Sequence, residues 1–237
     1  MFSKSAKFYD ELYASMDKDY AAETRALNKF IRQHKKAPGK SLLEAACGTG
    51  VHASHLSRHY SVEALDLDYE MLKVAKRNYP HIRFHHGDMV DFHLGRQFDI
   101  LTCLFSSIGY VQTKTRLRKA IQNMADHLVP GGILIIEPWF SPDQWSVGRV
   151  GMLSLERSDH TIVRVSRSGR RGKLSLLNFE YLIGTPKRIE HRSETHKLGL
   201  FTDEEYRSAF RAAKLDVTHD PKGLDGRGLY IGLKPLE

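Results

Sequence analysis

The sequence predicts an α/β fold with a seven-stranded, mostly parallel sheet, helices on both faces, and an antiparallel β cap inserted after the fifth strand. Between residues 41 and 137, short apolar runs alternate with segments of helical period, which is typical of a parallel sheet. Residues 141–200 contain no helix-period stretch and alternate like antiparallel strands. The last apolar runs, at 215–218 and 229–233, flank a glycine-rich loop and predict a terminal hairpin.

The pattern divides the chain into a core and a cap. We expect residues 1–140 and 201–237 to form the core, beginning with a helical segment over 1–37, and residues 141–200 to form the cap, which carries most of the basic excess. A capping box, Thr202 with Glu205, predicts the start of the last helix. The other expected helices are 51–59, 69–78 and 113–128, and the expected strands run through 42–43, 61–68, 82–86, 98–105, 133–137, 161–167, 173–183 and 188–200.

Length and composition indicate an ordinary globular protein. The chain has 237 residues, of which 41% are hydrophobic and 27% charged. Its net charge of +8 favours an anionic partner such as a phosphorylated metabolite, RNA or a membrane surface, although solubility alone explains it equally well. The N-terminal segment lacks an apolar signal region and no run is long enough to span a bilayer, so we expect a cytoplasmic protein without membrane contact and with free thiols.

The segment 41–50 organises the fold, because a short apolar strand there ends in Glu44 and a turn containing Gly48 and Gly50. Such a turn lies at the carboxyl edge of the sheet, where open α/β folds bind ligands. Glycine lets a ligand lie against the backbone, and the following helix presents unpaired N–H groups. This motif alone leaves three interpretations open: a nucleoside-type methyl donor, a dinucleotide, or a tight turn without a ligand.

Two further strand ends carry acids that suit a nucleoside. Asp66, after the second strand, can accept hydrogen bonds from both hydroxyls of a ribose, which NAD and S-adenosylmethionine (SAM) share. The third strand closes with Gly87, Asp88 and Met89. A carboxylate at that place suits the exocyclic amine of adenine, and a methionine suits the face of its ring.

The ordered motifs resemble those of the class I SAM-dependent methyltransferases, which have a Rossmann-like sheet. They are Glu44-x-x-x-Gly48-x-Gly50, Asp66, Gly87-Asp88-Met89, Phe98-Asp99 and Pro130-Gly131-Gly132. The resemblance implies that the glycine turn approaches the methionine portion and ribose, that Glu44 meets the ammonium group, and that Asp66 binds the ribose. The dinucleotide interpretation weakens because no second large α/β domain is present and the Pro-Gly-Gly turn has no role in it. The expected cofactor contacts are Tyr13, Tyr20, Glu44, Ala46, Cys47, Gly48, Gly50, Asp66, Leu67, Met71, Gly87, Asp88, Met89, Leu104 and Phe105.

A narrower resemblance is to the methyltransferases that N-methylate dTDP-linked aminosugars. The strings FSSIGY, EPWF and GRGL, at 105–110, 137–140 and 226–229, are longer than the general SAM motifs. The resemblance implies a 3-amino group on a nucleotide sugar as methyl acceptor, a cap that contacts the diphosphate, and a possible homodimer. One departure is Asp68, where the family's second strand often ends in serine.

Methyl transfer to an amine requires alignment more than a strong base. The candidates that could orient the amine or take its proton are Tyr13, Tyr110, Glu137 and His196. For the diphosphate we expect Arg167, Arg170 and Arg227, because a planar guanidinium matches phosphate oxygens. Ser106, Tyr110 and Trp139 complete the expected acceptor site, with core packing left open as the alternative for Trp139.

Two other functions fit the same motifs. An RNA methyltransferase would use the basic cap, but aromatic residues are sparse there, so we do not expect nucleic acid as a partner. A SAM-binding protein without catalysis would share the cofactor site. The thirteen histidines suggest a check for metal ligands, and His52, His55 and His59 share a helix face. Without an acid or cysteine at ligand spacing we expect no metal site and solvated histidines.

Overall fold

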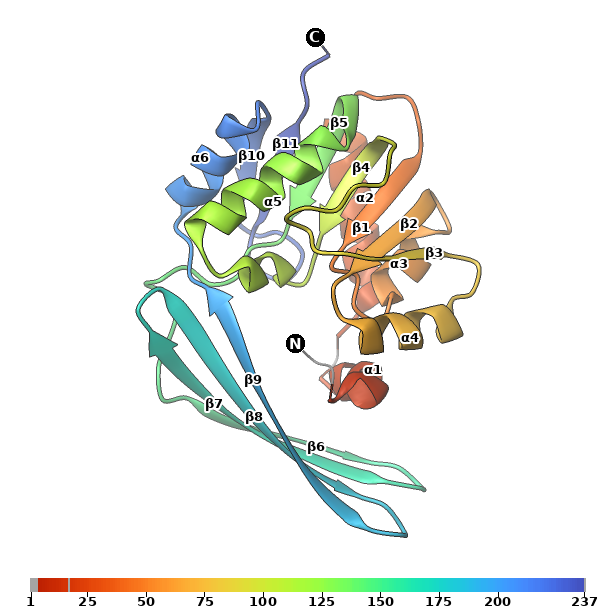
Figure 1. Cartoon of the computed structure of the whole chain (residues 1–237), viewed down its shortest axis with the longest axis vertical. Coiled ribbons are helices and arrows are strands. Elements are labelled where there is room, and N and C mark those ends of the chain that lie inside the picture. Colours follow the sequence, from red (N-terminus) through yellow and green to blue (C-terminus); the bar gives the residue numbers. More distant parts are fainter. Residues whose placement is uncertain (1–3, 17, 237) are drawn as a thin grey trace.

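The computed structural model describes residues 4–16 and 18–236, and it confirms the predicted α/β fold (Figure 1). A seven-stranded sheet forms the body of the protein. Its spatial order is β10 (Asp216–Asp220), β11 (Leu229–Leu233), β5 (Leu128–Ile136), β4 (Phe98–Cys103), β1 (Ser41–Ala45), β2 (Ser61–Asp66) and β3 (Arg83–His86). A second, four-stranded sheet extends away from it as long hairpins, in the order β6 (Val150–Glu156), β7 (Thr161–Arg171), β8 (Leu174–Gly184) and β9 (Ile189–Gly199).

Strand pairing in the large sheet follows the sequence pattern. Strands β3, β2, β1, β4 and β5 are paired in parallel, so their carboxyl ends share one edge. Strand β11 is antiparallel to both β5 and β10, which confirms the terminal hairpin. The second sheet is antiparallel throughout.

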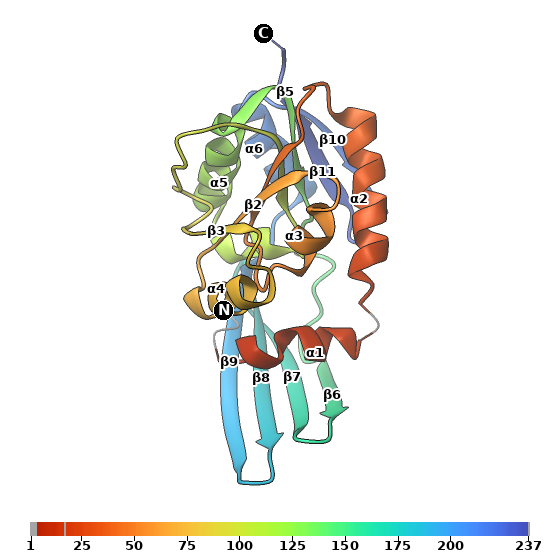
Figure 2. The ribbon, with the colours of Figure 1, turned by 90° about the vertical axis from the view of Figure 1, so that its right-hand side faces the viewer.

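Helices cover both faces of the large sheet (Figure 2). On one face, α5 (Lys114–Asp126) and α6 (Asp203–Ala212) bury Leu117, Ile121 and Phe210 against the sheet. On the other, α2 (Tyr20–His34) and α3 (Val51–Leu56) bury Leu27 and Leu56. The predicted capping box at the start of α6 is present, with Thr202 and Glu205 each bonded to the other's backbone N–H. None of the described helices is long and apolar enough to cross a membrane.

A short N-terminal helix joins the two sheets. The 3-10 turn η1 (Ala6–Phe8) runs into α1 (Tyr9–Ala14), which lies across the second sheet (Figure 2). Leu12 belongs to an apolar cluster with residues of β6, β7 and β8. Tyr9 belongs instead to a cluster with Met71 and Val74 of α4 (Tyr69–Asn78). Helix α1 therefore contacts both halves of the molecule.

Some predicted boundaries are wrong. Strand β6 was not expected, and the helix expected over 51–59 ends at Leu56. The Pro130-Gly131-Gly132 segment, expected as a turn before the fifth strand, lies inside β5 at a register shift against β4. Gly131 has φ of +75° there, and its carbonyl accepts hydrogen bonds from the backbone N–H groups of Lys36 and Ala37.

Candidate active site

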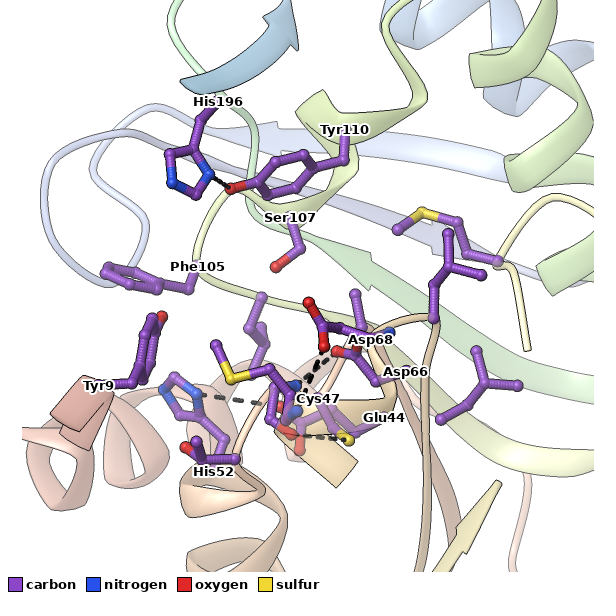
Figure 3. Close-up of a pocket in the computed structure, with 18 of the residues that line it drawn as sticks. Tyr9, Glu44, Cys47, His52, Asp66, Asp68, Phe105, Ser107, Tyr110 and His196 are labelled. Carbon is purple, nitrogen blue, oxygen red and sulfur yellow. Dashed lines mark hydrogen bonds and ion pairs between the residues drawn. The ribbon is translucent and has the colours of Figure 1, made fainter. Parts of the chain in front are cut away.

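A cavity lies at the carboxyl edge of β1, β2 and β4, and α1 and the inner face of the second sheet complete its walls (Figure 3). The expected cofactor contacts gather there, with the exception of Gly50. Those that line the cavity are Tyr13, Tyr20, Glu44, Ala46, Cys47, Gly48, Asp66, Leu67, Met71, Gly87, Asp88, Met89, Leu104 and Phe105. One edge of the sheet thus collects residues from the ends of β1, β2, β3 and β4, together with Tyr13, Tyr20 and Met71 from helices α1, α2 and α4.

The two glycines of the first turn have different roles. Gly48 lines the cavity with φ of +56°, and a Cβ added there would meet no protein atom within 4 Å. Gly50 precedes α3 with φ of +80°, and a Cβ there would lie 3.0 Å from the ring of Phe84. Gly48 therefore leaves room for a ligand against the backbone, whereas Gly50 permits close packing behind it.

Glu44 brings a buried carboxyl group to the cavity. Its side chain is 2% exposed, and Oε2 has no hydrogen-bond partner among the described residues. Burial raises the pKa of Glu44 to about 8, and the nearby charge of Asp66 adds to this effect. An unpartnered buried carboxylate oxygen fits the ammonium group of an amino-acid ligand.

Asp66 is held by the backbone around it. Oδ2 accepts a hydrogen bond from the Gly48 N–H at 2.7 Å, and Oδ1 accepts one from the Asp68 N–H at 2.7 Å. Burial raises the pKa of Asp66 to about 6, while these hydrogen bonds oppose the shift. Asp68 in turn caps the start of α4. The carboxylate of Asp66 is therefore fixed at the edge of the cavity, where it can accept hydrogen bonds from hydroxyl groups.

The adenine-binding residues expected after β3 also face the cavity. Asp88 accepts a hydrogen bond from the Val90 N–H at 3.1 Å and pairs with Arg116 at 2.6 Å. Met89 is 8% exposed. The short segment after β3 thus supplies an oriented carboxylate next to an apolar wall.

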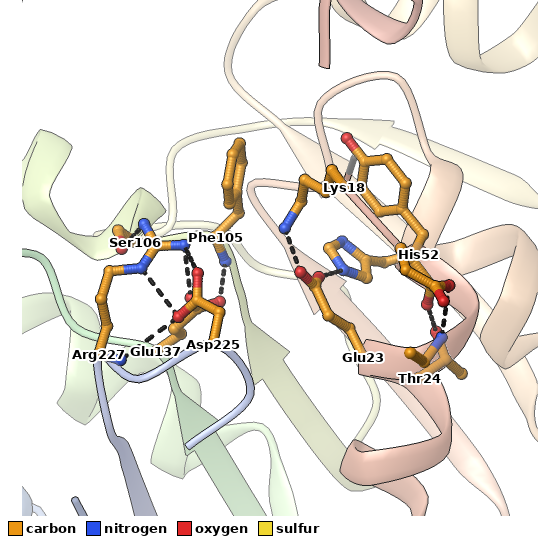
Figure 4. Close-up of polar contacts among 12 residues, drawn as sticks. Lys18, Glu23, Thr24, His52, Phe105, Ser106, Glu137, Asp225 and Arg227 are labelled. Carbon is orange, nitrogen blue, oxygen red and sulfur yellow. Dashed lines mark hydrogen bonds and ion pairs between the residues drawn. The ribbon is translucent and has the colours of Figure 1, made fainter. Parts of the chain in front are cut away.

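His52 is a site residue that the sequence did not indicate, and its expected solvation is wrong. The ring is 6% exposed, with the Tyr20 ring edge-on at 4.8 Å. Its Nε2 lies 2.8 Å from Glu23 of α2, and Lys18 pairs with the same carboxylate (Figure 4). Burial lowers the pKa of His52, although Glu23 opposes the shift. In the described part of the chain, no group of three or more His, Cys, Asp or Glu residues is placed to hold a metal ion.

The far end of the cavity is built by the second sheet. Leu177, Phe179, His196 and Leu198 line it from β8 and β9, opposite Tyr110. The Tyr110 hydroxyl lies 2.7 Å from His196 Nδ1 (Figure 3).

Behind His196 lies Glu194, whose Oε2 is 3.6 Å from His196 Nε2. Burial lowers the pKa of His196, and it raises the pKa of Tyr110 well above 10. Both groups are therefore neutral at neutral pH. Glu194 also accepts hydrogen bonds from the backbone of Lys4 and from Ser5.

Several expected acceptor residues lie elsewhere. Arg167 is exposed on the outer face of the second sheet, opposite the buried Arg164, because alternate residues of a strand face opposite ways. Arg170 donates to the carbonyls of Pro142 and Gly172. Neither is among the residues that line the cavity, and neither are Ser106 and Glu137.

Three of the expected acceptor residues do line the cavity, and Tyr110, described above, is one of them. Trp139 lies there while donating from Nε1 to the hydroxyl of Ser175 at 2.8 Å. Arg227 lies there while paired with Glu137 and Asp225.

Known proteins share this architecture over almost the whole chain. A methyltransferase domain family matches residues 42–132. The chain is 41% identical to the dTDP-3-amino-3,6-dideoxy-alpha-D-glucopyranose N,N-dimethyltransferase of Streptomyces fradiae, over 96% of this chain and 90% of that protein. It is 38% identical to the dTDP-3-amino-3,4,6-trideoxy-alpha-D-glucopyranose N,N-dimethyltransferase of Streptomyces venezuelae, over 96% and 97% of the two chains.

Solved structures are similar to this chain over nearly its whole length. The crystal structure of Streptomyces venezuelae DesVI has a TM-score of 0.91 and 37% identity, covering 97% of this chain and 98% of that one. SAM-bound CalS10, an amino pentose methyltransferase from Micromonospora echinaspora, has a TM-score of 0.86 and 35% identity, covering 95% and 96%. With its donor cavity, second sheet and near full-length similarity, the chain belongs to the class I SAM-dependent methyltransferases, in the family of the dTDP-aminosugar N-methyltransferases.

Proposed function

We propose that this enzyme N,N-dimethylates the 3-amino group of a dTDP-linked aminodeoxysugar. The observation that carries the proposal is the continuity of one cavity from the carboxyl edge of the large sheet, with Glu44 and Asp66, to Tyr110 and His196 at the second sheet. A donor and an acceptor can therefore meet in one cavity. Two relatives with 41% and 38% identity carry 3-amino sugars in their names, whereas a third, at 35%, carries a 4-amino sugar.

SAM supplies an electrophilic methyl group on a sulfonium. The amine must be neutral and in line with the S–CH₃ bond, and orientation of this kind accounts for roughly 7–11 kcal/mol in well-aligned reactions. Burial raises the pKa values of Tyr13 and Tyr110, so both hydroxyls stay protonated at neutral pH. We propose that these hydroxyls orient the amine. After the first transfer the methylated amine must lose a proton before it can be methylated again, and we propose that neutral His196 takes up this proton.

We propose that residues 141–200 form an acceptor-binding cap and that residues 1–140 and 201–237 form the cofactor-binding core, from which Tyr13 and Tyr110 reach the acceptor's amine. The lining of the cavity by Phe179 and His196 supports this division. Arg167 and Arg170 are assigned no contact with the acceptor because they lie outside the cavity. We also propose a cytoplasmic enzyme, since Cys47 and Cys103 are free thiols.

We further propose a homodimer, which the exposed apolar side chains on the second sheet support, since solvent-facing apolar patches often mark interfaces. These side chains are Val150, Met152, Val165 and Leu182.

The decisive experiment offers SAM with a dTDP-3-amino-3,6-dideoxyhexose and follows the sugar by mass spectrometry. We expect products with one and then two added methyl groups, together with S-adenosylhomocysteine. The N-acetylated sugar is the matched control, because its amide nitrogen is a poor nucleophile. The 4-amino isomer and RNA are offered in parallel. Methylation of RNA alone would favour the basic-cap alternative, and SAM binding without turnover of any acceptor would favour a non-catalytic protein.

A further inference from the structure

The turn after β4 is held in an unusual backbone conformation. Phe105 and Ser106 are consecutive non-glycine residues with φ of +52° and +59°. Left-handed backbone is unfavourable for residues with a Cβ and persists only where neighbouring groups enforce it. The turn lies at the cavity, which Leu104, Phe105 and Ser107 line.

Glu137, at the end of β5, is the group that holds this turn. Its Oε2 accepts a hydrogen bond from the Phe105 N–H at 2.6 Å, and its Oε1 lies 3.0 Å from Nη2 of Arg227 (Figure 4). The side chain is 1% exposed and is not among those that line the cavity. Both carboxylate oxygens are therefore engaged within the protein.

Arg227 closes the same network from the loop before β11. Its Nη1 donates to the hydroxyl of Ser106 at 2.9 Å, and that hydroxyl donates to the Pro138 carbonyl at 2.7 Å. Asp225 pairs with the same guanidinium and fixes its position. Each residue of the left-handed turn thus has its own hydrogen bond to the pair formed by Glu137 and Arg227.

The Phe105 ring, which this turn presents, contacts Tyr13 of α1 and Lys18. The Tyr13 ring meets the Phe105 ring edge-on, with centroids 5.1 Å apart and an interplanar angle of 87°. Lys18 Nζ lies 4.0 Å from the Phe105 ring centroid, and the guanidinium of Arg227 lies 5.3 Å from it. The position of the Phe105 ring therefore sets where the side chains of Tyr13 and Lys18 lie at the cavity.

We propose that Glu137 and Arg227 are positioning residues, which hold the Phe105–Ser106 turn in its left-handed form and so fix the Phe105 ring as a wall of the active site. Glu137 is not the base of the reaction. Its pKa of about 7 resembles that of a base, but burial is the main cause, with Arg227 opposing it. The kinetic readout rests on the proposed function, whereas the binding readout needs SAM alone.

The test compares variants of the full chain by kcat, KM, calorimetric Kd for SAM and thermal unfolding. Glu137→Ala removes the contacts with the Phe105 N–H and with Arg227. We expect kcat/KM to fall on the order of 100-fold, as for a misplaced reacting group. We also expect SAM to bind about tenfold more weakly. Glu137→Gln keeps an acceptor for the Phe105 N–H, so we expect a smaller loss and an unchanged pH profile of kcat.

A second substitution separates positioning from other roles. Adding Ser106→Gly to Glu137→Ala should restore about tenfold of kcat/KM, because glycine adopts this φ without strain. The matched control adds Gln112→Gly instead. Gln112 is an exposed residue with φ of +63° at the end of the turn η2 (Ser107–Val111), and no recovery is expected there.

The outcomes are distinct. A base at Glu137 predicts that Gln and Ala lose activity equally, that the acid limb of the pH profile disappears, and that glycine gives no recovery; this result would overturn the proposal. A lower unfolding temperature with unchanged kcat, KM and SAM affinity would also overturn it, because the pair would then be merely structural. Should wild type fail to methylate the aminosugar, the proposed function fails, and the SAM affinities of the same variants still decide the role of Glu137.

Discussion

Glu44 and Asp66 are two carboxylates buried side by side at the donor end of the cavity, exposed by only 2% and 8%. Such a pair is costly when both are charged, and burial raises both pKa values, to about 8 and about 6. The backbone N–H groups of Gly48 and Asp68 compensate Asp66. A backbone hydrogen bond from Ala53 compensates Glu44 in part, and we propose that the ammonium group of SAM supplies the rest.

A proton should therefore leave Glu44 when SAM binds. With a folded-state pKa of about 8, Glu44 is mostly protonated at pH 7 and must ionise to meet the ammonium. SAM affinity should rise from pH 6 to 8 and fall once the α-amino group, with a pKa near 8, is deprotonated. Calorimetry in two buffers of different ionisation enthalpy measures the released proton.

Glu44→Gln should abolish this release and weaken SAM binding by about 10- to 100-fold, the loss of one charge-assisted hydrogen bond. Glu63→Gln is the matched control, because Glu63 is a buried carboxylate on β2 that pairs with His85 and Arg96 and does not line the cavity. Equal proton release by Glu44→Gln and wild type would contradict the assignment.

Residues at strand ends were predictable because their place depends only on local pattern. Glu44, Asp66 and Asp88 follow apolar runs, and the parallel topology brings such positions to one edge. Partnerships across the chain were not predictable. His52 meets Glu23 from 29 residues away, and Arg227 meets Ser106 from 121 residues away. A helix-face pattern at His52 contains no information about such a partner.

At the scale of elements, the start of α2 is fastened to α3. Glu23 accepts a hydrogen bond from Lys18, just before the helix, and pairs with His52 of α3. The side chain of Glu23 is 11% exposed, that of Lys18 8% and that of His52 7%. Burial alone would raise the pKa of Glu23, but His52 and Lys18 outweigh it and the net shift is downward.

Glu23→Ala should lower the free energy of unfolding by about 1–3 kcal/mol, because it leaves two buried polar partners unsatisfied. A lowered folded-state pKa means that this stabilisation is present above the ordinary pKa of 4.5 and is lost as the pH falls below it. Urea denaturation at pH 7 and in acid checks both statements.

Glu70→Ala is the control, since it removes an exposed pair with Lys73 and should change stability by less than about 0.5 kcal/mol. A Glu23→Ala loss no larger than this, or one that persists undiminished in acid, would contradict the fastening role.

Helices and strands with buried apolar residues were predicted correctly, whereas an exposed strand was not. Helix α4 matches the predicted span 69–78, since its apolar residues face the sheet at helical spacing. Strand β6 escaped prediction because it is an edge strand with mostly exposed side chains, so no alternation marks it. The start of β5 escaped because proline and glycine are typical of turns, and here they occupy a bulge instead.

At the scale of the whole molecule, the six residues of α1 connect the second sheet with helix α4 of the large-sheet body. Tyr9 and Tyr13 line the cavity, while Leu12 on the same helix is 2% exposed among residues of the second sheet. The anchoring of α1 thus fixes two cavity walls at once.

Leu12→Ala should therefore weaken SAM binding about tenfold, because α1 is released from the second sheet with its tyrosines. Leu27→Ala, in α2 against the large sheet, is the matched leucine truncation. It should lower the free energy of unfolding by about 2–5 kcal/mol and leave SAM affinity unchanged. Calorimetry and denaturation separate the two effects, and unchanged SAM affinity in Leu12→Ala would show that the tyrosines are held by other contacts.

The attachment of α1 to the second sheet also bears on the design of hybrid enzymes. A chimera that imported residues 150–199 from a relative, to change the sugar it accepts, would set a foreign sheet against the native α1. It would also separate Glu194 from Lys4 and Ser5, which donate three hydrogen bonds to its carboxylate. The transferable unit is discontinuous in sequence, so a working exchange must carry residues 4–16 together with the sheet.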